Sequence, residues 1–159
     1  MQYILMFLFA AGIVTADQLT KAWIVNNLAL YESRQAIPGL FHLTYVQNTG
    51  AAFSAFEGMQ WLFIVIFAAF TVAIIWEFSR KRLPFAPCER WFIVAIYAGG
   101  LGNMIDRLRL GYVVDMIEVD FMTFPVFNVA DCFITCGCIL LFVHLLFMNR
   151  KFWKDEKKA

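Results

Sequence analysis

The chain has 159 residues, of which 62% are hydrophobic and 18% aromatic, and its formal net charge is +1. A soluble domain is near half apolar, so the apolar excess excludes an ordinary soluble domain and indicates a protein embedded in lipid. The near-neutral charge gives no sign of a strongly basic surface, and no nucleic-acid partner is expected.

Four stretches of the sequence lack any charged residue: 1–16, 58–76, 91–105 and 132–149. A helix that crosses a bilayer needs about 20 mostly apolar residues, with a usual range of about 17–25. Two stretches reach this length, and the other two reach it when polar residues at their ends join the helix. The sequence therefore predicts an all-α polytopic membrane protein, a single membrane domain over 1–159, with four transmembrane helices at about 3–23, 59–78, 91–108 and 130–148.

The first predicted helix begins with "MQYILM", which contains no Lys or Arg. A cleaved signal peptide starts with a positively charged region, so we expect this helix to be retained. Near its other end, Asp17 and Lys21 lie four positions apart, share one helix face and can form an ion pair. We interpret this pair as structural.

The next segment, at about 26–57, is too long for a bare turn. Its stretch "LFHLTYVQN" alternates enough to suggest short strands. The polar cluster "NTGAAF" follows and contains Asn48 and Gly50. The overlapping stretch "GAAFSAF" either offers small residues that let a helix or substrate backbone approach closely, or forms a loop with a tucked Phe.

The segments after the second and fourth predicted helices, at 79–90 and 149–159, carry nine of the 13 Lys and Arg residues. The positive-inside rule makes such segments cytoplasmic, so we expect both termini to be cytoplasmic. The stretches 17–57 and 106–131 then face outward.

The third predicted helix ends in "GGLGNMIDR", at 99–107. No strand precedes its glycines, so a dinucleotide site is excluded and close helix or substrate packing is the better interpretation. Asp106 has Arg107 beside it and Arg109 nearby, and we expect these arginines to hold Asp106 ionised in a structural role.

Two further acids, Asp115 in "VVD" and Asp131 in "FNVAD", have no basic neighbour within three residues. If the fold brings them together at the lipid edge, they must share a proton and can act as acid and base around one water. Asn128 is a good N-cap, which would put Asp131 at the third helical position, where the helix dipole favours an anion. We therefore hypothesise that Asp131 is the ionised base and Asp115 carries the shared proton.

Two alternatives remain open for these acids. Asp131 could be no more than a helix cap. Glu118 could replace Asp131 as the partner of Asp115 if residues 115–118 are helical.

The cysteines and histidines do not indicate a metal or cofactor. Cys88, Cys132, Cys136 and Cys138 lack zinc-ligand spacing and are interpreted as small apolar core residues. His42 is expected outside, and His144 about 20 Å deeper along the fourth helix, so the two cannot bind one haem.

Five polar clusters far apart in the sequence thus come to the outer membrane face: "DQLTK", "NTGAAF", "GGLGNMIDR", "VVD" and "FNVAD". Ionisable groups at a membrane edge are costly, so their convergence predicts a functional site.

Taken together, these clusters resemble the motifs of bacterial lipoprotein signal peptidases, or signal peptidase II, a family of membrane aspartyl proteases. The resemblance runs from Asp17 to Asp131 and implies that Asp115 and Asp131 are the catalytic dyad. The positions it implies for substrate binding and support are Asp17, Lys21, Asn48, Gly50, Asn103, Arg107 and Asn128.

The resemblance also implies an endopeptidase of the bacterial plasma (inner) membrane. Such enzymes remove the signal peptide of diacylglyceryl-modified prolipoproteins by cutting just before the lipidated cysteine. It further implies a small extracytoplasmic β-cradle with an interfacial helix, an active site at the outer face without a cofactor, a monomeric enzyme, and inhibition by globomycin-type cyclic peptides.

Two other functions fit less well. A small transporter or scaffold with a proton relay would show internal repeats, and none relates 1–78 to 79–148. Membrane aspartyl proteases of the prepilin peptidase or presenilin type carry a GxGD site, where this chain has "GNMID".

Overall fold

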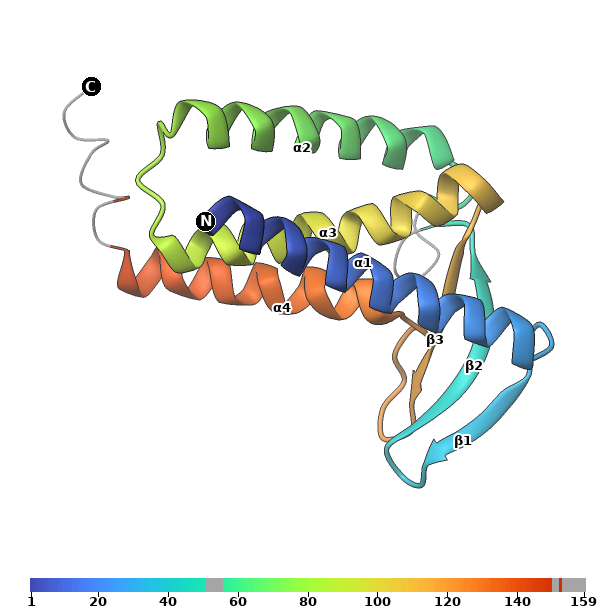
Figure 1. Ribbon diagram of the computed structural model, residues 1–159. Helices are drawn as coiled ribbons and strands as arrows, with labels where there is room; N and C mark the ends of the chain where they lie inside the picture. The colour runs from blue at the N-terminus through green and yellow to red at the C-terminus, as the bar shows by residue number, and fades with distance from the viewer. Residues whose placement is uncertain (51–55, 150–151, 153–159) are drawn as a thin grey trace.

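The computed structural model describes residues 1–50, 56–149 and 152. Figure 1 shows long helices running side by side, with a small sheet beyond one end of them. The helices are α1 (Gln2–Asn27), α2 (Gln60–Arg80), α3 (Pro87–Leu110) and α4 (Val129–Val143), which continues as a π-helix at His144–Met148. The strands are β1 (Ser33–Ile37), β2 (Phe41–Asn48) and β3 (Val113–Val119).

Three of these helices are long and apolar enough to cross a membrane: Gln2–Asn27, Gln60–Arg80 and Val129–Met148. Their apolar side chains point outward; α2, for example, contains no buried residue, and its Val65 is 63% exposed. Such surfaces would be unfavourable in water and suit lipid. The protein is therefore a mostly helical, multi-pass membrane protein.

The central helix is α3, which packs against α1, α2 and α4. Small residues permit this packing: a Cβ on Gly99 would lie 2.5 Å from the backbone oxygen of Ala130, and a Cβ on Gly102 would lie 2.6 Å from Asp17 Oδ2. A real Cβ atom essentially never lies within 3.0 Å of such an atom, so glycine is what allows α3 to approach α1 and α4 so closely. The predicted role of these glycines is confirmed.

The sheet is antiparallel, with strand order β1-β2-β3. The strands predicted near 40–48 are confirmed by β2, with β1 as its hairpin partner. An apolar cluster that includes Ile24, Tyr45 and Val114 packs the end of α1 against β2 and β3. The expected interfacial helix of this region is absent from residues 28–50 and 56–59; residues 51–55 lie outside the described part of the chain.

The third strand corrects the interpretation of Glu118. Residues 115–118 form part of β3 and are not helical, so positions 115 and 118 point to opposite faces of the sheet. The carboxyl group of Glu118 instead accepts a hydrogen bond from Thr44 on β2. The alternative pairing of Glu118 with Asp115 is therefore wrong.

Candidate active site

A buried ion cluster supports the end of the bundle that faces the sheet. Lys21 Nζ lies 2.9 Å from Asp17 Oδ2 and 3.0 Å from Asp106 Oδ2, and all three side chains are almost completely buried. The predicted pair of Asp17 and Lys21 is confirmed. The expected partners of Asp106 were wrong, because its ion pair is with Lys21 and not with Arg107 or Arg109.

This cluster also fixes the surrounding elements. The free oxygen of Asp17 accepts a hydrogen bond from the backbone N–H of Ala130 at 3.0 Å, at the start of α4. Asp106 accepts one from the backbone N–H of Val114 at 3.1 Å, on β3. Gln18, to which no role was assigned from the sequence, donates to Asp106 at 2.9 Å and to the backbone oxygen of Gly102. The cluster therefore ties α1, α3, α4 and β3 together.

Asp131 lies in the first turn of α4, as predicted. Asn128 is the N-cap: its side-chain oxygen accepts from the backbone N–H of Asp131 at 2.9 Å. Asp131 Oδ2 in turn accepts from the backbone N–H of Asn128 at 3.1 Å, which completes a capping box. The other oxygen of Asp131 accepts from Asn103 Nδ2 at 2.7 Å.

Asp115 lies on β3 and is only 2% exposed. Its oxygens accept hydrogen bonds from Asn128 Nδ2 at 2.6 Å and from Asn48 Nδ2 at 2.9 Å. Burial raises the pKa of Asp115 to about 7, and the negative charge of Asp131 raises it as well, while the amide donors oppose the shift. At neutral pH a large share of Asp115 is therefore protonated.

Two amides connect both acids to the buried lysine. Asn103 Oδ1 accepts from Lys21 Nζ at 2.9 Å and from Asn128 Nδ2 at 3.1 Å, which leaves its own amide N–H₂ to face Asp131. Asn128 contacts both acids, through its side chain to Asp115 and through its backbone to Asp131. The orientation of each carboxyl group is thus set by residues that are themselves buried and hydrogen-bonded.

Asn48, Gly50 and Arg107 form the edge of the site beside β2. Asn48 Oδ1 accepts from the backbone N–H of Gly50 at 2.9 Å, and Arg107 Nη2 donates to the Gly50 carbonyl at 2.7 Å. The Arg107 guanidinium also lies over the Phe63 ring, 4.3 Å from its centroid. These contacts tie α2, α3 and the end of β2 together at the position of Asp115.

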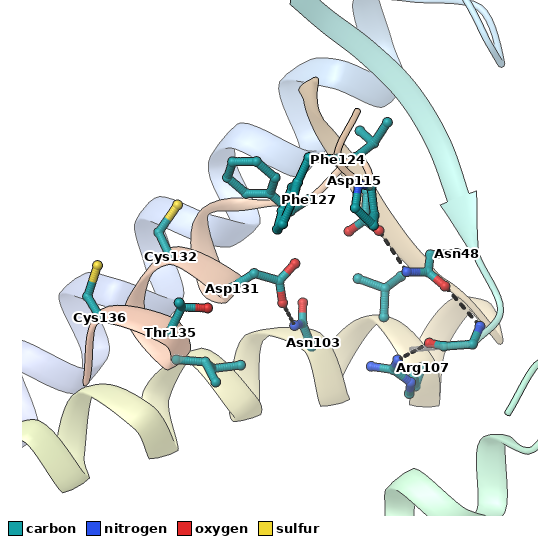
Figure 2. Close-up of a pocket in the computed structure, with 15 residues that line it drawn as sticks. Asn48, Asn103, Arg107, Asp115, Phe124, Phe127, Asp131, Cys132, Thr135 and Cys136 are labelled. Carbon is teal, nitrogen blue, oxygen red and sulfur yellow. Dashed lines mark hydrogen bonds between the residues drawn. The ribbon is translucent and has the colours of Figure 1, made fainter. Parts of the chain in front are cut away.

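The two acids line one cavity of about 510 Å³. Figure 2 shows Asp115 and Asp131 approaching it from β3 and α4, with Asn103 and Arg107 on the α3 side and Phe124 and Phe127 on another. The cavity continues along α4 past Cys132, Thr135 and Cys136, of which the last two are exposed on the helix surface. It therefore reaches from the acids to the lipid-facing side of α4.

Of the residues selected from the sequence, the cavity wall contains Asn48, Gly50, Asn103, Arg107, Asp115 and Asp131. Asn128 lies directly behind the acids, and Asp17 and Lys21 lie one layer further away. The wall at 124–127 was missed, because its apolar residues carry no chemical signal in the sequence. Within the described residues, no group of three or more His, Cys, Asp or Glu side chains could hold a metal ion.

Comparison with known proteins gives consistent matches. The model of a family described as "Signal peptidase (SPase) II" matches residues 9–147. A lipoprotein signal peptidase of Streptococcus pyogenes serotype M2 (strain MGAS10270) is 46% identical over 147 residues, which cover 91% of this chain and 90% of that protein. One from Streptococcus pyogenes serotype M1 is 45% identical with the same coverage.

Solved structures match as well. A bacterial membrane enzyme solved by the in meso method at 2.3 Å resolution has a TM-score of 0.83 at 32% identity, covering 92% of this chain and 90% of that one. A second, solved at 1.9 Å resolution, has a TM-score of 0.81 at 32% identity, covering 91% of this chain and 94% of that one.

Proposed function

The chain belongs to the signal peptidase II family, proteases that remove signal peptides from prolipoproteins, and we propose that Asp115 and Asp131 are its catalytic pair. The observation that carries the proposal is the cavity lined by both acids, which come from different elements and are held by shared amides. General acid–base catalysis needs such a pair on either side of a reacting carbonyl.

In this mechanism Asp131 is the base and Asp115 the acid. Asp131 accepts a proton from a water, whose oxygen attacks the scissile carbonyl carbon, while Asp115 donates its proton to the carbonyl oxygen. The assignment is supported by the raised pKa of Asp115 and by the backbone N–H of Asn128, which donates to Asp131 within a capping box. Return of a proton to the departing amine completes peptide-bond cleavage without a covalent intermediate.

The substrate in this proposal is a diacylglyceryl-modified prolipoprotein, cut just before the lipidated cysteine. Support comes from the shape of the cavity, which joins the two acids to the exposed face of α4 at Thr135 and Cys136. A substrate whose signal helix and acyl chains lie in the bilayer can enter from that side. Arg107 Nε is buried in the cavity wall without a hydrogen-bond partner among the described residues, and can donate to a substrate carbonyl.

We also propose that α3 is a fourth transmembrane span. Its 24 residues extend about 36 Å at 1.5 Å per residue, enough to cross a bilayer. It packs against the three other long helices, so its polar residues can face protein instead of lipid. The basic segments 79–90 and 149–159 then lie in the cytoplasm with both termini, and the segment 26–57 and the active site lie at the outer face. The cavity would be blocked by globomycin-type cyclic peptides, and each monomer would be complete.

The test is cleavage of a diacylated prolipoprotein in detergent by the wild type, Asp115→Asn and Asp131→Asn. Both variants should lose at least about 10³-fold in kcat, within the range for loss of a general acid or base. Glu118→Gln is the matched control on the same strand and should stay within about threefold of the wild type. Substantial activity in both aspartate variants would refute the mechanism, and rapid cleavage of an unlipidated precursor would refute the substrate.

A further inference from the structure

A second cluster of reactive side chains lies at the opposite end of α3. Cys88 is the second residue of this helix, about 22 Å along the axis from Asn103 at 1.5 Å per residue. Its Sγ lies 3.2 Å from Nε2 of His144, where α4 changes into the π-helix His144–Met148. The proposed peptidase mechanism uses neither residue.

His144 is held from its other side by Glu89. Its Nδ1 lies 2.7 Å from Glu89 Oε1, and the Glu89 side chain is completely buried. Glu89 also accepts hydrogen bonds from the backbone N–H of Ala86 at 2.6 Å and from Asn149 Nδ2 at 2.8 and 2.9 Å. Because a carboxyl oxygen of Glu89 faces Nδ1, a neutral His144 carries its ring proton on Nδ1 and donates it to Glu89.

That tautomer leaves the lone pair of Nε2 facing the sulfur. The Cys88 thiol therefore donates to Nε2, and transfer of this proton gives a thiolate beside an imidazolium, which the Glu89 carboxylate stabilises. A nucleophile within reach of a base that a third group orients is the arrangement that activates cysteines in enzymes. The position of Cys88 in the first turn of α3 adds a helix N-terminus, which favours negative charge.

The end of α4 helps to build this arrangement. The helix finishes in the π-helix His144–Met148, and turns of this kind occur at helix C-termini. Here the turn ends with the backbone N–H of Asn149 donating to the His144 carbonyl at 2.9 Å, and the Asn149 side chain reaches Glu89 and the Pro84 carbonyl. The irregular turn thus places both His144 and Asn149 on one carboxylate.

We propose that Cys88, His144 and Glu89 form a reactive-thiol site whose sulfur is oxidised by a peroxide to a sulfenic acid. The thiolate attacks one peroxide oxygen, an S–O bond forms and the O–O bond breaks. The departing hydroxide takes the proton from the His144 imidazolium and leaves as water. Sulfur loses two electrons, the peroxide gains them, and neutral histidine is regenerated. Cys88 is half-buried, which suits a small oxidant.

The experiment treats the folded enzyme in detergent at pH 7 with hydrogen peroxide and dimedone, a trap for sulfenic acids. Site-resolved mass spectrometry then follows Cys88 and Cys136 in the same sample. Cys136 is exposed on α4 and serves as the internal comparison. We expect Cys88 to be trapped at least about tenfold faster than Cys136, because thiolate content controls this rate. Equal rates at the two cysteines would overturn the proposal.

His144→Gln separates activation from simple exposure. This variant keeps a polar side chain of similar size but no base, and should slow the trapping of Cys88 at least about tenfold while prolipoprotein cleavage continues. An unchanged trapping rate in a variant that still cleaves would overturn the proposal. If His144→Gln does not fold, the wild type unfolded in urea and detergent replaces it: Cys88 must lose its advantage over Cys136 on unfolding, and a retained advantage would overturn the proposal.

Discussion

The two ends of the helical bundle each place a carboxylate at the same local position and use it differently. Asp131 and Glu89 are both the third residue of a helix, and each accepts a hydrogen bond from the backbone N–H of its N-cap residue. Glu89 is completely buried, and its oxygens contact His144, Asn149 and a backbone N–H. Asp131 is half-buried and lines a cavity.

A helix-capping position therefore does not decide whether an acid is structural or reactive. Glu89 has its oxygens occupied by protein donors, so in our interpretation it only orients a neighbour. Asp131 has one backbone donor and one amide donor and faces space that a substrate can enter. The structure thus bears on whether Asp131 is only a cap: it caps α4, and it also faces the same cavity as Asp115.

The strongest predicted loss of activity distinguishes Asp131 from Glu89. Asp131→Asn should reduce kcat for prolipoprotein cleavage by at least about 10³-fold, because the base is lost. Glu89→Gln should keep kcat within about tenfold, because its site lies at the far end of α3. Steady-state cleavage assays on both variants make the measurement. A larger loss of kcat in Glu89→Gln than in Asp131→Asn would contradict the roles proposed for these two carboxyl groups.

The second prediction concerns the ion cluster behind Asp131. Lys21→Met leaves Asp17 and Asp106 buried without their cation, and breaking a buried pair in this way costs about 3–5 kcal/mol of unfolding free energy. Arg34→Met breaks an exposed pair with Glu32, which should cost no more than about 1 kcal/mol. Thermal unfolding in detergent measures both, and similar losses in the two variants would contradict the structural role of Lys21.

The third prediction tests the close packing at the active-site end of α3. Gly102→Ala would press a methyl group against Asp17, and should cost about 1–3 kcal/mol and lower activity, because Asp17 holds the start of α4. Gly12→Ala on α1 is the control: apart from its chain neighbours and the adjacent helix backbone, no described atom lies within 4 Å of the added Cβ, so stability should be unchanged or slightly higher. Equal effects on the unfolding temperature would refute the packing argument.

The fourth prediction follows from the pKa of Asp115, which is raised to about 7. The protonated form that donates to the carbonyl is present below this pH, so kcat should fall by about tenfold between pH 7 and pH 8.5. The folded state holds this proton more tightly than the unfolded state. Asp115 therefore does not lower the free energy of unfolding below pH 4, and lowers it progressively as the pH rises to 7. Asp115→Asn should therefore raise the unfolding temperature at pH 8 more than at pH 5. Equal shifts of the unfolding temperature at pH 5 and pH 8 would show that the burial of Asp115 does not make stability depend on pH.

Much of the architecture followed from local sequence. The long helices were predicted because a bilayer-spanning segment is an uninterrupted apolar run, and β2 because its side chains alternate along the chain. The capping box of Asn128 and Asp131 and the pair of Asp17 and Lys21 involve residues three or four positions apart, so their spacing was enough. The family followed from five short motifs taken together, each of them made of residues close together in the chain.

Contacts between distant segments could not be predicted in this way. The sequence suggested Arg107 as the partner of Asp106 because the two are adjacent, whereas the structure pairs Asp106 with Lys21, on another helix. It also gave no sign that residues 113–119 extend the sheet, because strand pairing with β2 is decided by the partner. Neither Gln18 nor the contact between Cys88 and His144 could be foreseen from spacing.

Local sequence was enough to predict long apolar helices, the capping box at Asp131 and the family. Each of these depends on the chemistry of residues close together in the chain. The pairing of Lys21 with Asp106 and the cavity in front of Asp115 and Asp131 came from the tertiary structure alone. Both depend on burial and on partners that distant helices and strands bring to a carboxyl group, which spacing along the chain does not reveal.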